Sequence, residues 1–294
     1  MADPKERGEV SRTASSTGYQ PGDWFWDSRK KSLSTPSTIL FNTLRLLDLP
    51  LQWYFLRSGL GISLIKTLNG TPISPSASPP TSLGLSPYHS LIFGLAVGSS
   101  AKQIYWKSFI NDTSMPLGFS TVVCVYNTVL NSFNTLLALW AVTSQQPLDE
   151  SSFSAMLSSA PLAVKVAIPV YSVGLFVEWW CEIQRQAFKR DARNKGKPYA
   201  GGLFGIVRNV NYSGYTLWRS GYSLACGGWV WAAAQAAWLF GDFAARAVPS
   251  MDAYCEKRVS HHYAVRVCFV ICCANVKSSM ASNGPKSSAR SRTP

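Results

Sequence analysis

Long apolar runs, separated by short basic or Pro/Ser-rich breaks, fill most of the chain after residue 36. The clearest runs cover residues 90–109, 117–142 and 161–180. A run of about 20 mostly apolar residues can cross the hydrocarbon core of a bilayer as a helix. A soluble domain would instead disperse its apolar residues at amphipathic spacing. We therefore predict an all-α fold, a polytopic integral membrane helical bundle of about five to six transmembrane helices.

The charge distribution supports a membrane rather than a nucleic-acid partner. The formal net charge is +13, but the Lys and Arg residues form short clusters at the ends of apolar runs. Such clusters mark the cytosolic side of a membrane protein. The basic amino terminus and the cluster at 185–197 therefore predict a cytosolic lip, and we expect an endoplasmic reticulum membrane. The Cys and His residues show no metal-ligand spacing, so we expect no metal, and the sequence does not specify an oligomeric state.

Composition shifts divide the chain into four segments. Residues 1–35 are polar and lack an apolar core, which predicts a disordered cytosolic tail. Residues 36–160 hold the amino-terminal membrane helices, with one kinked segment at 38–65 and an exposed loop at 69–87. Residues 161–258 form a second membrane part, in which 215–243 is expected to be a single span. Residues 259–294 form a separate tail.

Polar residues inside the apolar runs are candidates for function. Gln103 lies within membrane reach and is a candidate substrate contact, whereas the neighbouring Lys102 is expected to extend its amine to the interface. Asn127, Asn131 and Asn134 recur at helical spacing and share one face. They either join neighbouring helices or bind a ligand.

The richest set of chemical groups lies at 195–224. Gly201 and Gly202 allow close approach of backbone to a ligand. Lys197 and Arg208 offer charged donors to phosphate. Neutral donors follow in the pair Asn211 and Tyr212, and together these groups are typical of nucleotide binding.

These residues carry a resemblance to a known family. The chain from about 174 to 258 resembles the carboxy-terminal domain of the steroid 5-alpha-reductase family, in its DUF1295 branch, and is also similar to sterol C14 reductases. Asn209 and Tyr215 stand where that family usually has His and Glu. The matching residues are Gly174, Glu178, Phe188, Lys189, Asn194, Lys195, Gly196, Lys197, Gly202, Leu203, Phe204, Arg208, Asn211, Tyr212, Ser213, Gly214, Tyr254, Cys255, Lys257 and Arg258.

The resemblance implies an NADPH-dependent reductase of an activated carbon–carbon double bond in a lipophilic substrate such as a sterol, another isoprenoid or an enoyl lipid. Tyr212 or Tyr215 would donate the proton. Glu178 would lie near the substrate and is, like Gln103, a candidate substrate contact. The residues expected around NADPH are Asn194, Lys197, Arg208, Asn211, Tyr212 and Arg258.

Two other function classes remain open. Isoprenylcysteine carboxyl methyltransferases share this architecture and carry a related Arg-His-Pro-x-Tyr signature, in which Asn209 and Val210 here replace His and Pro. Such an enzyme would bind S-adenosylmethionine. The departures at Asn209 and Tyr215 equally suit a non-catalytic membrane scaffold.

The resemblance stops after Arg258, where the family would continue with Tyr-Gly and a nearby Trp. Val259-Ser260 can be encoded by the splice-donor sequence GTAAGT, and Ser278-Ser279 can contain an acceptor CAG. The shifted frame through 280–284 can then read Tyr-Gly-Glu-Gln-Trp. We therefore predict that 259–294 translates a short retained intron, typical of a fungal gene, and then an out-of-frame exon. The alternative is a divergent tail, and sequencing the spliced transcript separates the two.

Overall fold

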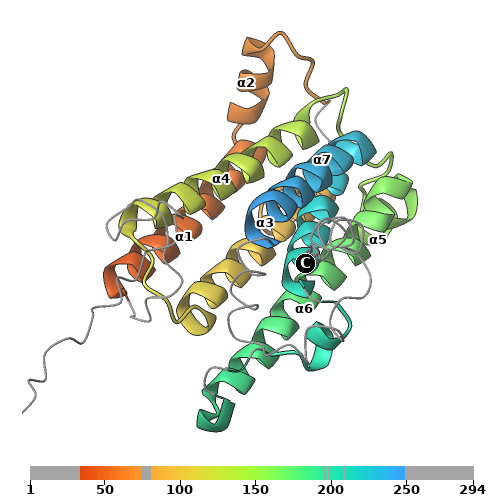
Figure 1. The fold of residues 1–294 in the computed structure, drawn as a ribbon. Coiled ribbons are helices and arrows are strands. Elements are labelled where there is room, and N and C mark those ends of the chain that lie inside the picture. The colour runs from red at the N-terminus through yellow and green to blue at the C-terminus, as the bar shows by residue number, and fades with distance from the viewer. Residues whose placement is uncertain (1–33, 74–80, 195–196, 198, 208, 249–294) are drawn as a thin grey trace, which may run out of the picture.

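The computed structural model describes residues 34–73, 81–194, 197, 199–207 and 209–248. The segment 259–294 and residues 1–33 of the expected tail lie outside this part of the chain. The described residues form an all-helical bundle, shown in Figure 1. Its α-helices are α1 (Thr35–Arg57), α2 (Leu60–Thr67), α3 (Pro87–Tyr105), α4 (Leu117–Leu139), α5 (Phe153–Ser159), α6 (Leu162–Arg190) and α7 (Val210–Asp242).

Short irregular helices extend or connect these elements. Two π-helical turns, Trp106–Ile110 and Phe243–Ala247, continue α3 and α7. Two 3-10 turns, Ala192–Asn194 and Gly202–Gly205, lie in the connection between α6 and α7. That connection is the basic lip expected from the sequence, and its turns keep it close to the end of α6.

The helices alternate in direction through the bundle. Hydrogen bonds join α1 to α4 at a constant sequence separation of 83 residues, so the two helices run parallel and in register. In the same way, α3 and α6 are parallel, with contacts separated by 76 residues. Because α3 bonds to α1 in the antiparallel sense, the pair α1 and α4 runs opposite to the pair α3 and α6. This alternation is what a chain threading back and forth through a bilayer would show.

Two expected spans are each interrupted by a glycine with a left-handed backbone. The segment predicted at 38–65 is two helices, because Gly59 adopts φ +75° between α1 and α2. The predicted single span at 215–243 is also wrong, because Gly228 has φ +71° and breaks α7 into two helical stretches. The second stretch returns along the first, so that Phe243 stacks on Tyr212 with ring centroids 4.6 Å apart. An L-residue rarely adopts this conformation, which explains the glycine at each break.

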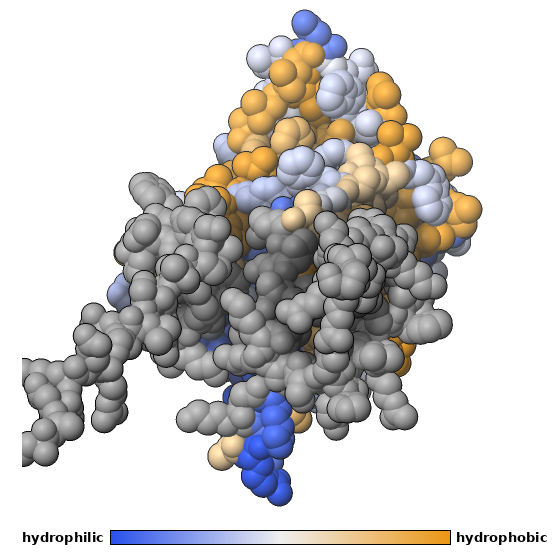
Figure 2. Space-filling model, viewed as in Figure 1, coloured by the Kyte–Doolittle hydropathy of each residue, from blue (hydrophilic) through white to orange (hydrophobic). Residues whose placement is uncertain are grey.

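The surface of the bundle is strongly apolar along its flanks. Within the described residues, α4 and α6 are long and apolar enough to cross a membrane. Large exposed apolar side chains also occur on α1 and α7, for example Leu46 and Val230. Figure 2 shows hydrophobic residues on the flanks and a hydrophilic projection at one end, where Figure 1 places the end of α6. The structure thus supports membrane association, and the count of five to six spans stays a prediction.

Candidate functional site

An aromatic cluster forms where α7 begins and where its returning stretch ends. Tyr212 and Tyr215 occupy successive turns of α7 and both are partly buried. Tyr212 stacks against Phe243, and Tyr215 meets both Phe243 and Trp218 edge-to-face. The cluster depends on the break at Gly228, because only the returning stretch brings Phe243 to the start of α7. It offers partly accessible ring faces beside a basic lip.

Glu178 lies deep beside this cluster and is held by two donors. Its carboxylate pairs with Lys102 of α3 and accepts a 2.6 Å hydrogen bond from the indole nitrogen of Trp218. The backbone of Glu178 lies against Gly214, where an added Cβ would come within 2.8 Å of the Glu178 nitrogen. The missing side chain at Gly214 therefore lets α6 and α7 approach closely at this residue. Lys102 forms a buried ion pair with Glu178, so the expectation that it extends to the interface is wrong.

Arg219 connects the aromatic cluster to the middle of the bundle. Its guanidinium lies 4.5 Å from the Trp218 ring centroid, and its Nε donates to the Tyr215 hydroxyl at 3.4 Å. Its Nη1 donates to the Oδ1 of Asn131 on α4 at 3.0 Å. Arg219 is almost completely buried, so its charge acts inside the bundle rather than at the surface.

The lip residues surround the end of α6. Asn194 donates from its side-chain amide to the Phe188 carbonyl, which satisfies a carbonyl at the helix end. Lys197 is exposed, and its backbone nitrogen donates to the Asn194 carbonyl. Gly202 adopts φ +53° against Gln184, whose side chain accepts from the Leu203 nitrogen. Hydrogen bonds from Arg193 lower the pKa of the neighbouring Asp191 carboxyl.

The structure brings some of the predicted site residues together and separates others. Glu178, Tyr212 and Tyr215 lie around the start of α7, and Asn211 sits in the same helical turn as Tyr212. Gln103 faces away from this group, because its amide nitrogen donates to Asn127 on α4 and both side chains are buried. Arg208 and Arg258 lie outside the described residues.

The three asparagines of α4 join helices, as one of the two sequence interpretations predicts. Asn127 binds α3 through Gln103, and Asn131 binds α1 through Asp48 and α7 through Arg219. Asn134 accepts hydrogen bonds from α7 at Ser223 and Trp231. Of the two acidic residues of α6, Glu182 pairs with Arg185 in the basic segment, whereas Glu178 pairs with Lys102 of α3.

Sequence reasoning missed a buried polar cluster on α1. Arg45, Asp48 and Gln52 are buried on the side of α1 that faces α4. Arg45 pairs with Asp48 at 3.2 Å, and Gln52 donates to the other oxygen of Asp48 at 2.9 Å. Their spacing of three and four residues was visible in the sequence and would have placed them on one helix face.

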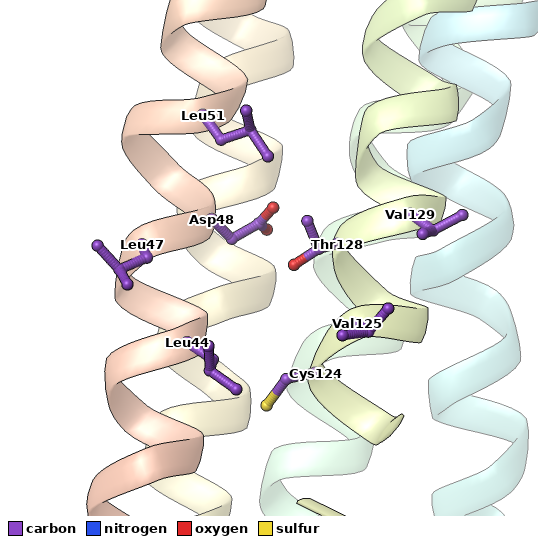
Figure 3. A pocket seen from close by; sticks show the side chains of 8 residues that line it. All are labelled: Leu44, Leu47, Asp48, Leu51, Cys124, Val125, Thr128 and Val129. Atoms are coloured by element: carbon purple, nitrogen blue, oxygen red, sulfur yellow. The ribbon is translucent and has the colours of Figure 1, made fainter. Parts of the chain in front are cut away.

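A pocket opens beside these charges, between α1 and α4. It has a volume of about 220 Å³, and Figure 3 shows Asp48 and Thr128 pointing toward each other across it. Cys124 contributes a thiol to the same space. The rest of the lining is aliphatic and consists of Leu44, Leu47, Leu51, Val125 and Val129.

Comparison with known proteins decides the family. The model of a protein family of unknown function, DUF1295, matches residues 119–261. A probable O-methyltransferase, ustE of Ustilaginoidea virens, is 36% identical over 237 residues, which cover 79% of this chain and 82% of that protein. The chain belongs to the DUF1295 family. No solved structure matches it.

Membership in DUF1295 confirms the family branch that the sequence resemblance predicted. The comparisons also favour the methyltransferase class over the reductase class. The resemblance to steroid 5-alpha-reductases has no support among these findings. The name of the Ustilaginoidea virens relative agrees instead with the methyltransferase alternative. The family match ends at residue 261, close to Arg258, where the sequence resemblance also stops.

Proposed function

We propose that this protein is a membrane-embedded O-methyltransferase that uses S-adenosylmethionine to methylate an oxygen of a lipophilic substrate. The observation that carries the proposal is the relative named as a probable O-methyltransferase, because its 36% identity extends over most of both chains. The alternating helices and apolar flanks support a bundle of about five to six spans, with the basic lip facing the cytosol of an endoplasmic reticulum membrane.

The residues around the start of α7 fit S-adenosylmethionine by their chemistry. This donor supplies a methyl group on a positively charged sulfonium, together with a carboxylate and an adenine. Ring faces attract cations, and the partly buried rings of Tyr212 and Tyr215 provide such faces. Lys197 is an exposed cation suited to the carboxylate, and Asn211 adds an amide close to Tyr212.

The buried residues behind the cluster give it a fixed shape. The Trp218 indole nitrogen donates a hydrogen bond to the Glu178 carboxylate, and this carboxylate forms an ion pair with Lys102. Trp218 packs edge-to-face on Tyr215, so this chain of contacts fixes the Tyr215 ring from α3 and α6. We assign Glu178 this positioning role, and Gln103 positions α3 against α4 in the same sense. Neither side chain has to meet the substrate.

Ligand binding tests the proposal before the substrate is known. The purified chain in lipid nanodiscs is titrated calorimetrically with S-adenosylmethionine, S-adenosylhomocysteine and NADPH. We expect both adenosyl compounds to bind and NADPH not to bind. Tyr212→Leu should weaken S-adenosylmethionine about three- to thirtyfold, as loss of a cation–ring contact would. Tyr54→Leu, at an exposed tyrosine of α1, is the matched control and should leave affinity unchanged.

The same titrations distinguish the competing functions. Binding of NADPH without S-adenosylmethionine would overturn the methyltransferase proposal in favour of a reductase. Folded protein that binds none of the three compounds would favour a non-catalytic scaffold. If S-adenosylmethionine bound equally well to the Tyr212→Leu variant, the protein would remain a methyltransferase, but its donor site would lie elsewhere.

A further inference from the structure

Three short segments of the chain carry the Asn-x-Ser/Thr motif that accepts an N-linked glycan. They are residues 69–71 (Asn-Gly-Thr), 111–113 (Asn-Asp-Thr) and 211–213 (Asn-Tyr-Ser). The middle residue is not proline in any of them, so each satisfies the motif. N-linked glycans are added on the lumenal side of the endoplasmic reticulum membrane. The end of the bundle at which a motif lies therefore decides whether it can be modified.

Two of the motifs lie at the end of the bundle that carries the lip. Residues 111–113 follow the π-helical turn Trp106–Ile110, and Gln186 near the end of α6 donates to the Phe109 carbonyl in that turn. Residues 211–213 lie in the first turn of α7, directly after the connection that forms the lip. With the lip facing the cytosol, neither motif meets the lumen.

The third motif lies at the opposite end of the bundle. α1 begins beside the π-helical continuation of α3, where Asn42 donates to Ser108. It ends beside the start of α3, where Arg57 donates to the Gly84 carbonyl. α2 leads on from this second end, and its 8 residues rise about 12 Å before residues 69–71 follow. Figure 1 shows α2 projecting from one end of the bundle and the end of α6 from the other.

The basic residues between the long helices agree with this orientation. At the end that holds residues 69–71, the segments 58–86 and 140–161 contain Lys66 as their single Lys or Arg. Positive residues concentrate in the cytosolic connections of membrane proteins. The end with α2 therefore has the composition of a lumenal side. At the lip end, the segment 191–209 alone contains Arg193, Lys195, Lys197 and Arg208.

The turn after α2 presents its acceptor amide at the surface. Asn69 has a left-handed backbone, φ +58°, and its backbone nitrogen donates to the Lys66 carbonyl. Asparagine adopts this conformation more readily than most residues. The side chains of Asn69 and Thr71 are both exposed, so the folded turn has room for a glycan. By contrast, Asn111 and Thr113 are 8% and 9% exposed, and the Thr113 hydroxyl donates to the Asn111 Oδ1 at 2.6 Å.

We propose that Asn69 is a site of N-linked glycosylation on the lumenal face of the membrane. In this reaction the side-chain nitrogen of Asn69 forms a bond to the anomeric carbon of a lipid-linked oligosaccharide. The bond from that carbon to the lipid diphosphate breaks, and its electron pair stays on the diphosphate oxygen. The amide gives one proton to a base of the oligosaccharyltransferase. The proposal rests on the membrane orientation proposed above and not on methyl transfer.

Removal of the glycan by an endoglycosidase tests the site. The full chain with an epitope tag is expressed in yeast, and its microsomes are treated with endoglycosidase H before electrophoresis. We expect one glycan per chain, seen as a single step in mobility that the enzyme removes. Asn69→Gln and Thr71→Ala should each abolish the step, whereas Thr71→Ser should retain it, because the motif requires a hydroxyl group.

Variants at the other two motifs are the matched controls. Thr113→Val and Ser213→Ala each destroy one motif at the lip end, and both should leave the mobility step unchanged. A glycan that peptide mass spectrometry maps to Asn111 or Asn211 would place the lip in the lumen and overturn the proposal. The absence of any glycan, in cells that glycosylate a secreted reporter protein, would overturn it as well.

Failure of this inference is distinguishable from failure of the proposed function, because the two are measured independently. A glycan at Asn69 in folded protein that does not bind S-adenosylmethionine would keep the modification site and remove the methyltransferase. Binding of S-adenosylmethionine by a chain that carries no glycan at Asn69 would do the reverse.

Discussion

Two helix pairs of this bundle are held together by different physical means: the parallel pair α1 and α4, and the antiparallel pair α6 and α7. The pair α1 and α4 is joined by polar side chains in register, from Ser37 with Ser120 at one end to Gln52 with Thr135 at the other. The pair α6 and α7 instead brings its backbones together at small residues such as Gly214 and Gly221. In a membrane both solutions are common, because lipid leaves helices little hydrophobic reason to associate.

The difference predicts where the molecule tolerates change. A polar interface depends on matched partners, so removing one partner leaves the other buried and unsatisfied. A close-packed interface depends on the absence of side-chain volume, so adding one methyl group is the damaging change. The pocket lies beside the first kind of interface, and the aromatic cluster lies beside the second.

Breaking the ion pair of α1 should have the largest effect. Asp48→Leu leaves Arg45 buried without its carboxylate, and we expect it to cost about 3–5 kcal/mol in the free energy of unfolding. The double variant Arg45→Met with Asp48→Leu should recover most of this loss, because it removes both charges together. Unfolding in sodium dodecyl sulfate, followed by circular dichroism, measures both values. Equal damage in the single and double variants would show that the charge pair is not what joins α1 to α4.

Adding a methyl group to the glycine interface should have an intermediate effect. At Gly221 an added Cβ would lie 2.6 Å from the Tyr171 backbone nitrogen, so Gly221→Ala must push α6 and α7 apart. We expect a loss of about 1–3 kcal/mol. At Gly94 of α3 an added Cβ meets nothing within 4 Å, so Gly94→Ala is the matched control. That control should be neutral or slightly stabilising, because alanine favours the helix; equal effects at both glycines would argue against close packing.

Hydropathy anticipated the existence of these helices better than their limits. The apolar run at 117–142 became α4, which ends at Leu139. The run at 161–180 became α6, which continues to Arg190 because the pairing of Glu178 with Lys102 and of Glu182 with Arg185 lets charged residues stay in the helix. A kink was expected within 38–65 but not its place at Gly59, and the break at Gly228 was not predicted. A glycine inside an apolar run gives the same hydropathy whether the chain reverses there or continues, so only packing against other helices decides.

The candidate site could be predicted in its chemistry but not in its geometry. The family resemblance placed Tyr212 near a cofactor and made Tyr212 or Tyr215 the proton donor, and the structure shows both tyrosines in one aromatic cluster. Their partner Phe243 could not be foreseen, because it arrives only after the reversal at Gly228. Arg45 and Asp48 interrupt the apolar run at 38–65, but the sequence assigns them no partner. Their role emerged from the helix that faces them, which no local pattern in α1 identifies.

Removing one neutral hydrogen bond from the polar interface should have the smallest effect, and it tests whether that interface is a sum of pairs. Thr135 donates to the Oε1 of Gln52 at 2.7 Å, so Thr135→Val removes one partner while keeping the shape of the side chain. We expect a loss of about 0.6 kcal/mol, the average for hydrogen bonds between membrane helices. Thr121→Val, at an exposed threonine of α4 that bonds only within its own helix, should change nothing measurable. A loss several times larger at Thr135 would mean that Gln52 transmits the defect to Asp48, to which it also donates, so that the interface behaves as one cooperative network.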